Sequence, residues 1–194
     1  MPTVFSHCAT GLIASKISNA GASDTKLTIT CAALAAFPDV DALFRGWFRD
    51  DQLLAHRGLT HSVFFACAIG FPVAFFFKRA FLREASALRL WALFSLTMAS
   101  HGFFDAMTDG GSGIAFFAPF NNSRYFLPWR PIPVAPLSAG QLLTTRGVHV
   151  LVVEMALFWT FAAGAALWGS NLARKSLAGV FFTAGLVAWT LALP

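Results

Sequence analysis

Long apolar runs separated by short polar segments dominate the chain, and the lengths of these runs define the expected elements. Four runs, over residues 60–77, 88–104, 148–168 and 177–193, approach the roughly 20 residues that a helix needs to cross a bilayer. Two shorter apolar segments lie between residues 4 and 37 and end before a proline, so they predict a helical hairpin packed against longer helices. The pattern therefore predicts an all-α fold, a polytopic membrane helical bundle with four clear transmembrane helices plus an N-terminal helical hairpin.

The polar segments between these runs complete a single integral-membrane domain over residues 1–194. In chain order we expect the helical hairpin (4–37), a polar motif loop (38–59), two transmembrane helices (60–104), a long interfacial loop (105–147) and two further transmembrane helices (148–193). The interfacial loop is rich in Gly, Pro and Asn, and long loops without a helical pattern are usually functional or disordered. Its aromatic residues, including Tyr125 and Trp129, favour an ordered loop at the membrane surface.

Composition and charge favour a membrane protein over a soluble domain. Hydrophobic residues make up 57% of the chain and charged residues only 12%, whereas soluble domains carry about 25% charged residues. The net charge of +5 comes from basic residues scattered at the ends of the apolar runs. This distribution indicates membrane anchors and topology signals, and no nucleic-acid partner is expected.

Polar residues that could carry chemistry fall at corresponding ends of the predicted helices. If the helices thread back and forth across the membrane, the second and the fourth return to the face on which the first begins. The residues brought to that face are His7, Asp39, Asp41, His56, His61, His101 and Asp105. Polar groups are costly in a membrane, so their concentration at one face indicates a functional site.

The spacing of His101 and Asp105 points to a metal ion. Residues four apart lie about 40° apart around a helix, so both side chains can face one cation, and Asp109 would follow on the same line if the helix continued. Neutral imidazole and carboxylate ligands suit Zn, Mn or Fe(II). The three cysteines form no cluster that could add thiolate ligands. We therefore expect a divalent metal, Zn before Mn or Fe, as one or two ions.

Other polar residues are candidates for catalysis and substrate binding. The candidate catalytic carboxylates are Asp39, Asp109 and Glu154, and the last lies inside a predicted helix, where an unpaired carboxylate is costly. The candidate substrate-binding residues are Arg57, Thr60, Arg124 and Arg130, because guanidinium groups match anionic oxygens. The alternative for the arginines is snorkelling to the interface. For His149 we favour an ordinary interfacial histidine over a ligand.

These motifs, in their order along the chain, resemble those of a known family. They are His7, Pro38-Asp39-Val40-Asp41, His56-Arg57-Gly58-Leu59-Thr60-His61-Ser62, His101-Gly102-Phe103-Phe104-Asp105-Ala106-Met107-Thr108 and, after a Gly-rich stretch, Phe117-Ala118-Pro119-Phe120. The resemblance is to the YdjM-like family of predicted membrane-bound metal-dependent hydrolases. It implies metal-site positions at His7, Asp39, His56, His61, His101 and Asp105, with Asp41 and Asp109 beside them.

We therefore expect an enzyme of the bacterial inner membrane, a metal-dependent hydrolase that acts on a lipid-linked phosphate or a phospholipid through metal-activated water. Ester or amide hydrolysis is an open alternative for the bond that is cleaved. A metal-ion or proton-coupled transporter would instead spread polar residues through the membrane depth. An accessory membrane protein with a structural metal would have a coordinatively closed site. A small excess of basic residues in the loops opposite the polar cluster predicts that the site faces outward.

Overall fold

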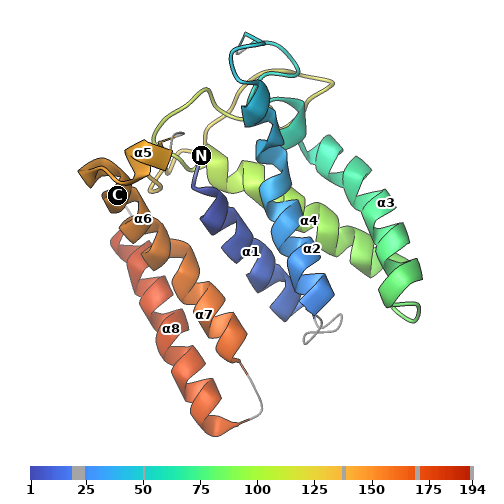
Figure 1. The fold of residues 1–194 in the computed structure, drawn as a ribbon, viewed down its shortest axis with the longest axis vertical. Helices are drawn as coiled ribbons and strands as arrows, with labels where there is room; N and C mark the ends of the chain where they lie inside the picture. Colours follow the sequence, from blue (N-terminus) through green and yellow to red (C-terminus); the bar gives the residue numbers. More distant parts are fainter. Residues whose placement is uncertain (19–24, 50, 137–138, 169–170, 193–194) are drawn as a thin grey trace.

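The computed structural model describes residues 1–18, 25–49, 51–136, 139–168 and 171–192, and its regular elements in these ranges are helices (Figure 1). No β-strand occurs in the described residues, where three isolated β-bridges are the only extended pairings. The prediction of an all-α fold is confirmed.

Three antiparallel helical pairs make up the molecule (Figure 1). The first is α1 (Val4–Ile17) with α2 (Thr25–Ala36), and the second is α3 (Val63–Phe81) with α4 (Ala87–Ala106). In the third, α6 (Thr145–Glu154) continues through a π-helical turn (Met155–Trp159) into α7 (Thr160–Leu167), which packs on α8 (Leu172–Leu191). The α1–α2 pair lies in the middle, since α2 contacts α4 and α1 contacts α7.

Three stretches of helix are long and apolar enough to cross a membrane: Thr25–Phe44, Val63–Phe81 and Thr145–Leu167. The prediction of four clear transmembrane helices plus a hairpin is therefore wrong in its count. Beyond α2 the chain continues as the 3₁₀ helix η1 (Phe37–Phe44), because Pro38 lies in the first turn, where a missing N–H costs nothing. That continuation gives the second half of the expected hairpin the length of a span.

The predicted spans over 88–104 and 177–193 correspond to α4 and to α8, which ends at Leu191, but neither helix is among the stretches apolar enough to cross a membrane. The α4 helix carries Ser95, Thr97, His101 and Asp105, all of them buried. The first turn of α8 contains Arg174 and Lys175. Because the polar side chains of α4 are covered by other helices, this helix is an inner element of the bundle.

Two clusters of buried side chains hold the helices together, one on each side of the α1–α2 pair. Leu27 of α2, Phe77 of α3 and Phe94 of α4 belong to the first cluster. Ala9 of α1 and Phe158 of the π-helical turn belong to the second, together with residues of the interfacial segment. Large apolar side chains on the outer face of α3 are exposed, as expected of a surface that faces lipid.

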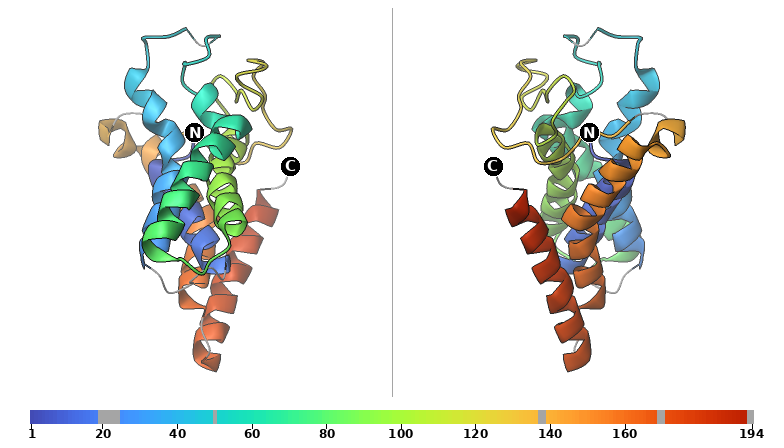
Figure 2. Two further views of the ribbon diagram at one scale, coloured as in Figure 1. Left: turned by 90° about the vertical axis from the view of Figure 1, so that its right-hand side faces the viewer. Right: turned by 90° about the vertical axis from the view of Figure 1, so that its left-hand side faces the viewer.

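The irregular segments gather at one end of the molecule. The segment between η1 and α3 and the segment between α4 and α5 (Ala139–Leu142) lie together beyond the same helix ends (Figure 2). Backbone hydrogen bonds join them, because Ala115 N–H donates to the Arg57 carbonyl and Val63 N–H donates to the Phe116 carbonyl. This end, where Met1 also lies, is where the polar motifs meet.

Candidate metal centre

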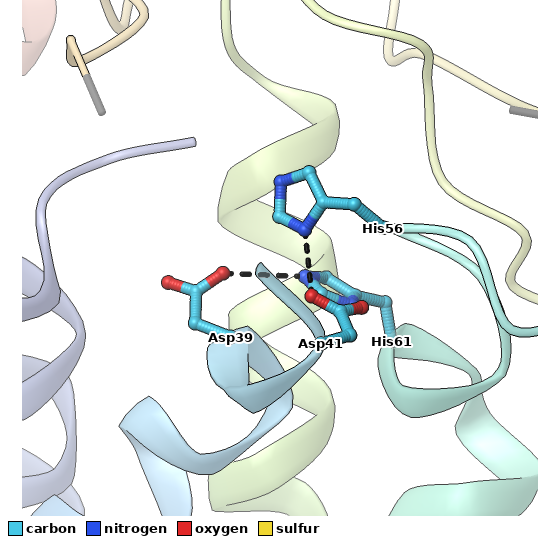
Figure 3. Close-up of side chains that lie close together, drawn as sticks. All are labelled: Asp39, Asp41, His56 and His61. Atoms are coloured by element: carbon cyan, nitrogen blue, oxygen red, sulfur yellow. Dashed lines mark hydrogen bonds and ion pairs between the residues drawn. The ribbon is translucent and has the colours of Figure 1, made fainter. Parts of the chain in front are cut away.

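Four separate elements deliver the predicted ligands to one place. His7 comes from α1, Asp39 and Asp41 from η1, His56 and His61 from the segment that ends in the 3₁₀ turn η2 (Leu59–His61), and His101 and Asp105 from α4. Figure 3 shows the side chains of Asp39, Asp41, His56 and His61 turned toward one another.

Two overlapping groups of side chains have ligand atoms within 4.8 Å of one another. One group is Asp39, Asp41, His56 and His61, and the other is Asp39, His61, His101 and Asp105. His7 adjoins the second group, because its Nε2 lies 3.4 Å from Asp105 Oδ1 and its ring stacks on that of His101 with 3.6 Å between the centroids. All seven residues predicted as metal ligands therefore lie together.

Many of the converging polar atoms are buried without a hydrogen-bond partner. They are both ring nitrogens of His7, both carboxylate oxygens of Asp39 and of Asp105, and Nε2 of His61 and of His101. An unsatisfied buried polar group costs about 1–3 kcal/mol, and more when it is charged, so such a set rarely accumulates by chance. A bound divalent cation would accept lone pairs from these nitrogen and oxygen atoms, and such ligand atoms fit Zn, Mn or Fe(II).

Hydrogen bonds on the far side of two imidazoles aim their Nε2 atoms into the cluster. His101 Nδ1 lies 2.7 Å from the Ala35 carbonyl, which can only accept, so Nδ1 carries the proton and Nε2 keeps a lone pair. His61 Nδ1 lies 3.0 Å from the Thr60 hydroxyl and 3.2 Å from Asp41 Oδ2. Histidines that bind metals are oriented in this way by a carbonyl or a carboxylate on the other nitrogen.

Asp41 is already occupied by groups of the protein. Its carboxylate accepts hydrogen bonds from His56 Nδ1 at 2.6 Å, from the Arg57 N–H at 3.2 Å and from the Thr60 hydroxyl at 2.5 Å, in addition to the contact with His61. Asp41 thus orients the histidines, and the group of Asp39, His61, His101 and Asp105 is the better metal site. An ion in that group would contact unsatisfied atoms of all four residues.

The electrostatics of the site centre on His61. Burial alone would lower the pKa of this imidazole. Its contacts with Asp39 and Asp41 have the larger effect in the opposite direction and raise the pKa to about 9. At neutral pH and without a metal, His61 is therefore a cation among carboxylates. Metal binding requires a neutral imidazole, so a divalent cation at Nε2 would displace that proton.

Two glycines permit the close approach of the elements that carry the ligands. A Cβ on Gly102 would lie 2.6 Å from the His61 carbonyl, so only glycine lets α4 pack directly on η2. A Cβ on Gly58 would lie 2.3 Å from the Leu53 carbonyl. Immediately before Gly58, Arg57 has φ +65°, a conformation that costs a non-glycine residue about 1–3 kcal/mol.

Arg57 is a structural cation of the site, whereas the sequence predicted a substrate clamp. Its side chain is 2% exposed, and Nε lies 3.1 Å from Asp105 Oδ2. The other two guanidinium nitrogens donate to the Gly110 carbonyl at 2.9 Å and to Thr108 Oγ1 at 3.1 Å. All three nitrogens are engaged, so Arg57 fixes Asp105. Thr108 was missed by sequence reasoning, although its place one turn after Asp105 was a usable signal.

The other predicted substrate-binding residues have different surroundings. Thr60 donates to Asp41 and belongs to the support of the site. Arg124 donates from Nη1 to the His56 carbonyl at 2.8 Å, so it fixes the backbone at the edge of the cluster. Arg130 is exposed and lies over the ring of Phe126, 5.1 Å from its centroid. Of the four residues, Arg57 and Thr60 contact carboxylates of the cluster with their side chains, whereas Arg124 contacts the backbone beside it.

Two of the predicted catalytic carboxylates lie outside the cluster. The α4 helix ends at Ala106, so Asp109 leaves the line of His101 and Asp105 and instead accepts from the Val134 N–H at 2.7 Å. Glu154 accepts from the Thr3 N–H at 2.7 Å, from the Ser6 hydroxyl at 2.7 Å and from the Thr3 hydroxyl. Only Asp39, of the three, offers its carboxylate to the cluster. His149 is exposed and belongs to neither group.

Glu154 therefore fixes the start of α1 against the third helical pair, a contact that no sequence pattern in Thr3 or Ser6 announced. Replacing Glu154 with alanine should lower the free energy of unfolding by about 3 kcal/mol, because buried donors lose their acceptor. Metal content should be kept. Thermal unfolding and elemental analysis of the detergent-purified variant would check this, with exposed Glu84→Ala as the control. Metal loss from a folded Glu154→Ala protein would contradict the assignment.

The fold and the cluster define an integral membrane protein with a buried site of metal-ligand type. The chain belongs to the YdjM inner membrane protein family, whose model matches residues 1–192. It is 32% identical over 170 residues to the inner membrane protein YbcI of Escherichia coli (strain K12), an alignment that covers 87% of this chain and 96% of that relative. No solved structure matches the chain. The predicted family and the predicted inner-membrane location are confirmed.

Proposed function

We propose that this protein is a membrane-embedded metal-dependent hydrolase that acts on a lipid-linked phosphate or a phospholipid. The observation that carries the proposal is the convergence of unsatisfied nitrogen and oxygen atoms from α1, η1, η2 and α4. Placing these polar groups together in the interior costs desolvation free energy, although they come from four elements in distant parts of the chain. Such an arrangement is favoured where a divalent cation and its chemistry compensate for the cost.

The metal would be held by His61 and His101 through Nε2 and by the carboxylates of Asp39 and Asp105, with His7 beside them. A divalent ion bound there would supply Lewis-acid activation of water and of a phosphoryl oxygen. Asp41 holds the His61 ring in its orientation, and Arg57 Nε, 3.1 Å from Asp105 Oδ2, holds that carboxylate at its ligand position.

His56 is suited to proton transfer at the edge of the site. Its Nδ1 is bonded to Asp41, which leaves Nε2 to take or give a proton, and a carboxylate partner of this kind stabilises the imidazolium that results. The His56 side chain is 11% exposed and that of Asp39 is 10% exposed, whereas those of His61, His101 and Asp105 are fully covered. The substrate would therefore approach past His56 and Asp39.

A lipid substrate is supported by an apolar groove of about 430 Å³ between α1 and α4. At its upper end it is lined by Thr10, one turn after His7, and by Ser100 and Phe104, which flank His101 on α4. From there it runs along the helices toward Ile17 and Leu93. A hydrocarbon chain in this groove would leave its polar head near the cluster.

An accessory protein with a structural metal is the second candidate, and the burial of His61, His101 and Asp105 favours it. Structural metal sites are closed by protein ligands, whereas catalytic sites keep a position for water. A transporter has less support, because the candidate ligands lie near helix ends, with His7 in the first turn of α1 and Asp105 in the last turn of α4, rather than through the length of the helices.

The two candidates are separated by an activity screen on detergent-purified protein that has been stripped with a chelator and reloaded with Zn, Mn or Fe(II). We expect phosphate release from a lipid-linked diphosphate or headgroup release from a phospholipid with one of these metals. His56→Ala should bind the metal normally and lose about 100-fold or more in rate, the usual share of a general acid or base. Stoichiometric metal with no hydrolysis in the wild type, and unfolding on chelation, would favour the structural role.

A further inference from the structure

A second groove lies at the opposite end of the second helical pair, between α3 and α4, and has a volume of about 850 Å³. Its walls are apolar and aromatic side chains of the two helices: Phe71, Ala74, Phe75, Ala87, Leu88 and Trp91. Phe71 is 66% exposed and Leu88 is 67% exposed, so the groove opens outward from the bundle. On a helix with the composition of a membrane span, this opening faces the acyl chains of the bilayer.

Three basic residues stand at one end of this groove, where α3 ends and the turn to α4 begins. They are Lys78 and Arg79 in the last turn of α3 and Arg83 in the turn, and both arginines are exposed. The α3–α4 turn also carries Glu84, which does not line the groove. The rim is therefore cationic and the walls are apolar, as on the surface that an anionic amphiphile would require.

The groove is built on a fixed turn. The Lys78 ammonium donates to the carbonyls of Arg83 and Ala85 and so ties the end of α3 to the start of α4. The Trp91 indole N–H donates to the Cys67 carbonyl at 3.0 Å and holds the floor of the groove together. Because Lys78 and Trp91 are engaged in these bonds, the two arginine side chains are the groups that remain to contact a ligand at the rim.

We propose that this groove binds a phospholipid with an anionic headgroup. The headgroup phosphate lies between Arg79 and Arg83, whose planar guanidinium groups match phosphate oxygens, and one acyl chain lies along the wall from Phe75 to Leu88. The position of the rim arginines along the membrane normal fits this placement, since the headgroup region begins at the last turn of a spanning helix. This lipid site is separate from the candidate metal centre, because His61 precedes the start of α3 and Asp105 lies in the last turn of α4, at the other ends of these helices.

Native mass spectrometry of the full chain, delipidated in a neutral detergent, tests the proposal with two lipid probes. Phosphatidylglycerol should give retained adducts and phosphatidylcholine should not. Each arginine near a phosphate contributes about fivefold in affinity, so Arg79→Gln with Arg83→Gln should weaken phosphatidylglycerol binding about thirtyfold. The matched control, Arg174→Gln with Lys175→Gln, removes two exposed charges from the same end of the protein but outside the groove. It should bind as the wild type does.

Several results would overturn the proposal. Equal retention of the two lipids, or equal weakening by the two double variants, would show that the rim arginines do not select an anionic headgroup. Dimers in place of lipid adducts would show that a second copy of the chain covers the groove. The Leu88→Gln variant tests the apolar walls and should also reduce the phosphatidylglycerol adducts. Undiminished adducts would show that the lipid does not bind in this groove.

Discussion

Replacing His61 or His101 with alanine should abolish binding of the divalent metal that we propose for this site in detergent-purified protein. Each substitution deletes a buried Nε2 atom that makes no hydrogen bond and lies within 3.2 Å (His101) or 3.6 Å (His61) of Asp39 Oδ1. Loss of a group that only orients a metal ligand already costs about 10–100-fold in affinity, so loss of the ligand itself should exceed about 100-fold. Elemental mass spectrometry after gel filtration, with the wild type alongside, gives the metal-to-protein ratio directly.

His149→Ala is the matched control, because this histidine is exposed and lies in neither ligand group. It should keep the wild-type metal ratio. Membrane insertion and the gel-filtration profile should be unchanged in all three variants. Stoichiometric metal in a folded His101→Ala protein would place the ion elsewhere, and a wild type that takes up no metal on reloading would remove the basis of the proposed hydrolase.

Replacing Arg57 with methionine should lower the free energy of unfolding of the metal-free protein by about 3–5 kcal/mol, the usual cost of removing one partner from a buried ion pair. Asp105 would lose its nearest fixed cation, and the Gly110 carbonyl would lose its donor. Arg130→Met should change stability far less, because that side chain is exposed and lies over Phe126. Thermal unfolding in detergent, compared between the two variants, measures the difference.

A bound divalent cation should reduce this effect, since it supplies positive charge to the same carboxylate. The loss in melting temperature caused by Arg57→Met should therefore be smaller after metal loading than after chelation. Equal losses in the two states would show that the metal does not share Asp105 with Arg57. Equal stability of Arg57→Met and Arg130→Met would contradict the role of Arg57 as the counter-charge of the site.

The convergence of His7, Asp39, His61, His101 and Asp105 could be predicted from sequence because it depends on a simple rule. Helices that alternate in direction bring every second connection to the same face, so polar residues near those connections meet. Neither side-chain contacts nor exact helix lengths are needed for that inference. The same reasoning located the irregular loop over the site, although α6 begins at Thr145, three residues earlier than the predicted span.

Roles that depend on contacts between distant residues could not be inferred in this way. The partners of Glu154 are about 150 residues away, at Thr3 and Ser6, and nothing in their spacing marks them. For Arg57 the sequence indicates a cation near the site but not the direction of its guanidinium group. Asp109 was misplaced for a local reason, because α4 ends at Ala106 and the helical register does not extend to it.

The predicted number of spanning helices was wrong partly because of the polar site, which makes α4 too polar to count as a span. Hydropathy measures how well a helix dissolves in lipid, whereas α4 is covered by its neighbours and carries ligands. A proline at residue 38 looked like the end of a helix, yet η1 continues the element through Phe44. Where a helix of a membrane bundle carries the polar side chains of a buried site, hydropathy therefore underestimates its tendency to span the membrane.

The polarity of α4 also bears on how the protein is made. A helix with a buried histidine and aspartate enters lipid poorly by itself, whereas α3 is apolar enough to enter on its own. The turn over Leu82–Ser86, tied by Lys78, links the two closely enough for them to leave the insertion machinery as a pair. We therefore expect α4, which carries His101 and Asp105, to enter the membrane together with α3, so that assembly of the candidate ligand cluster begins during synthesis.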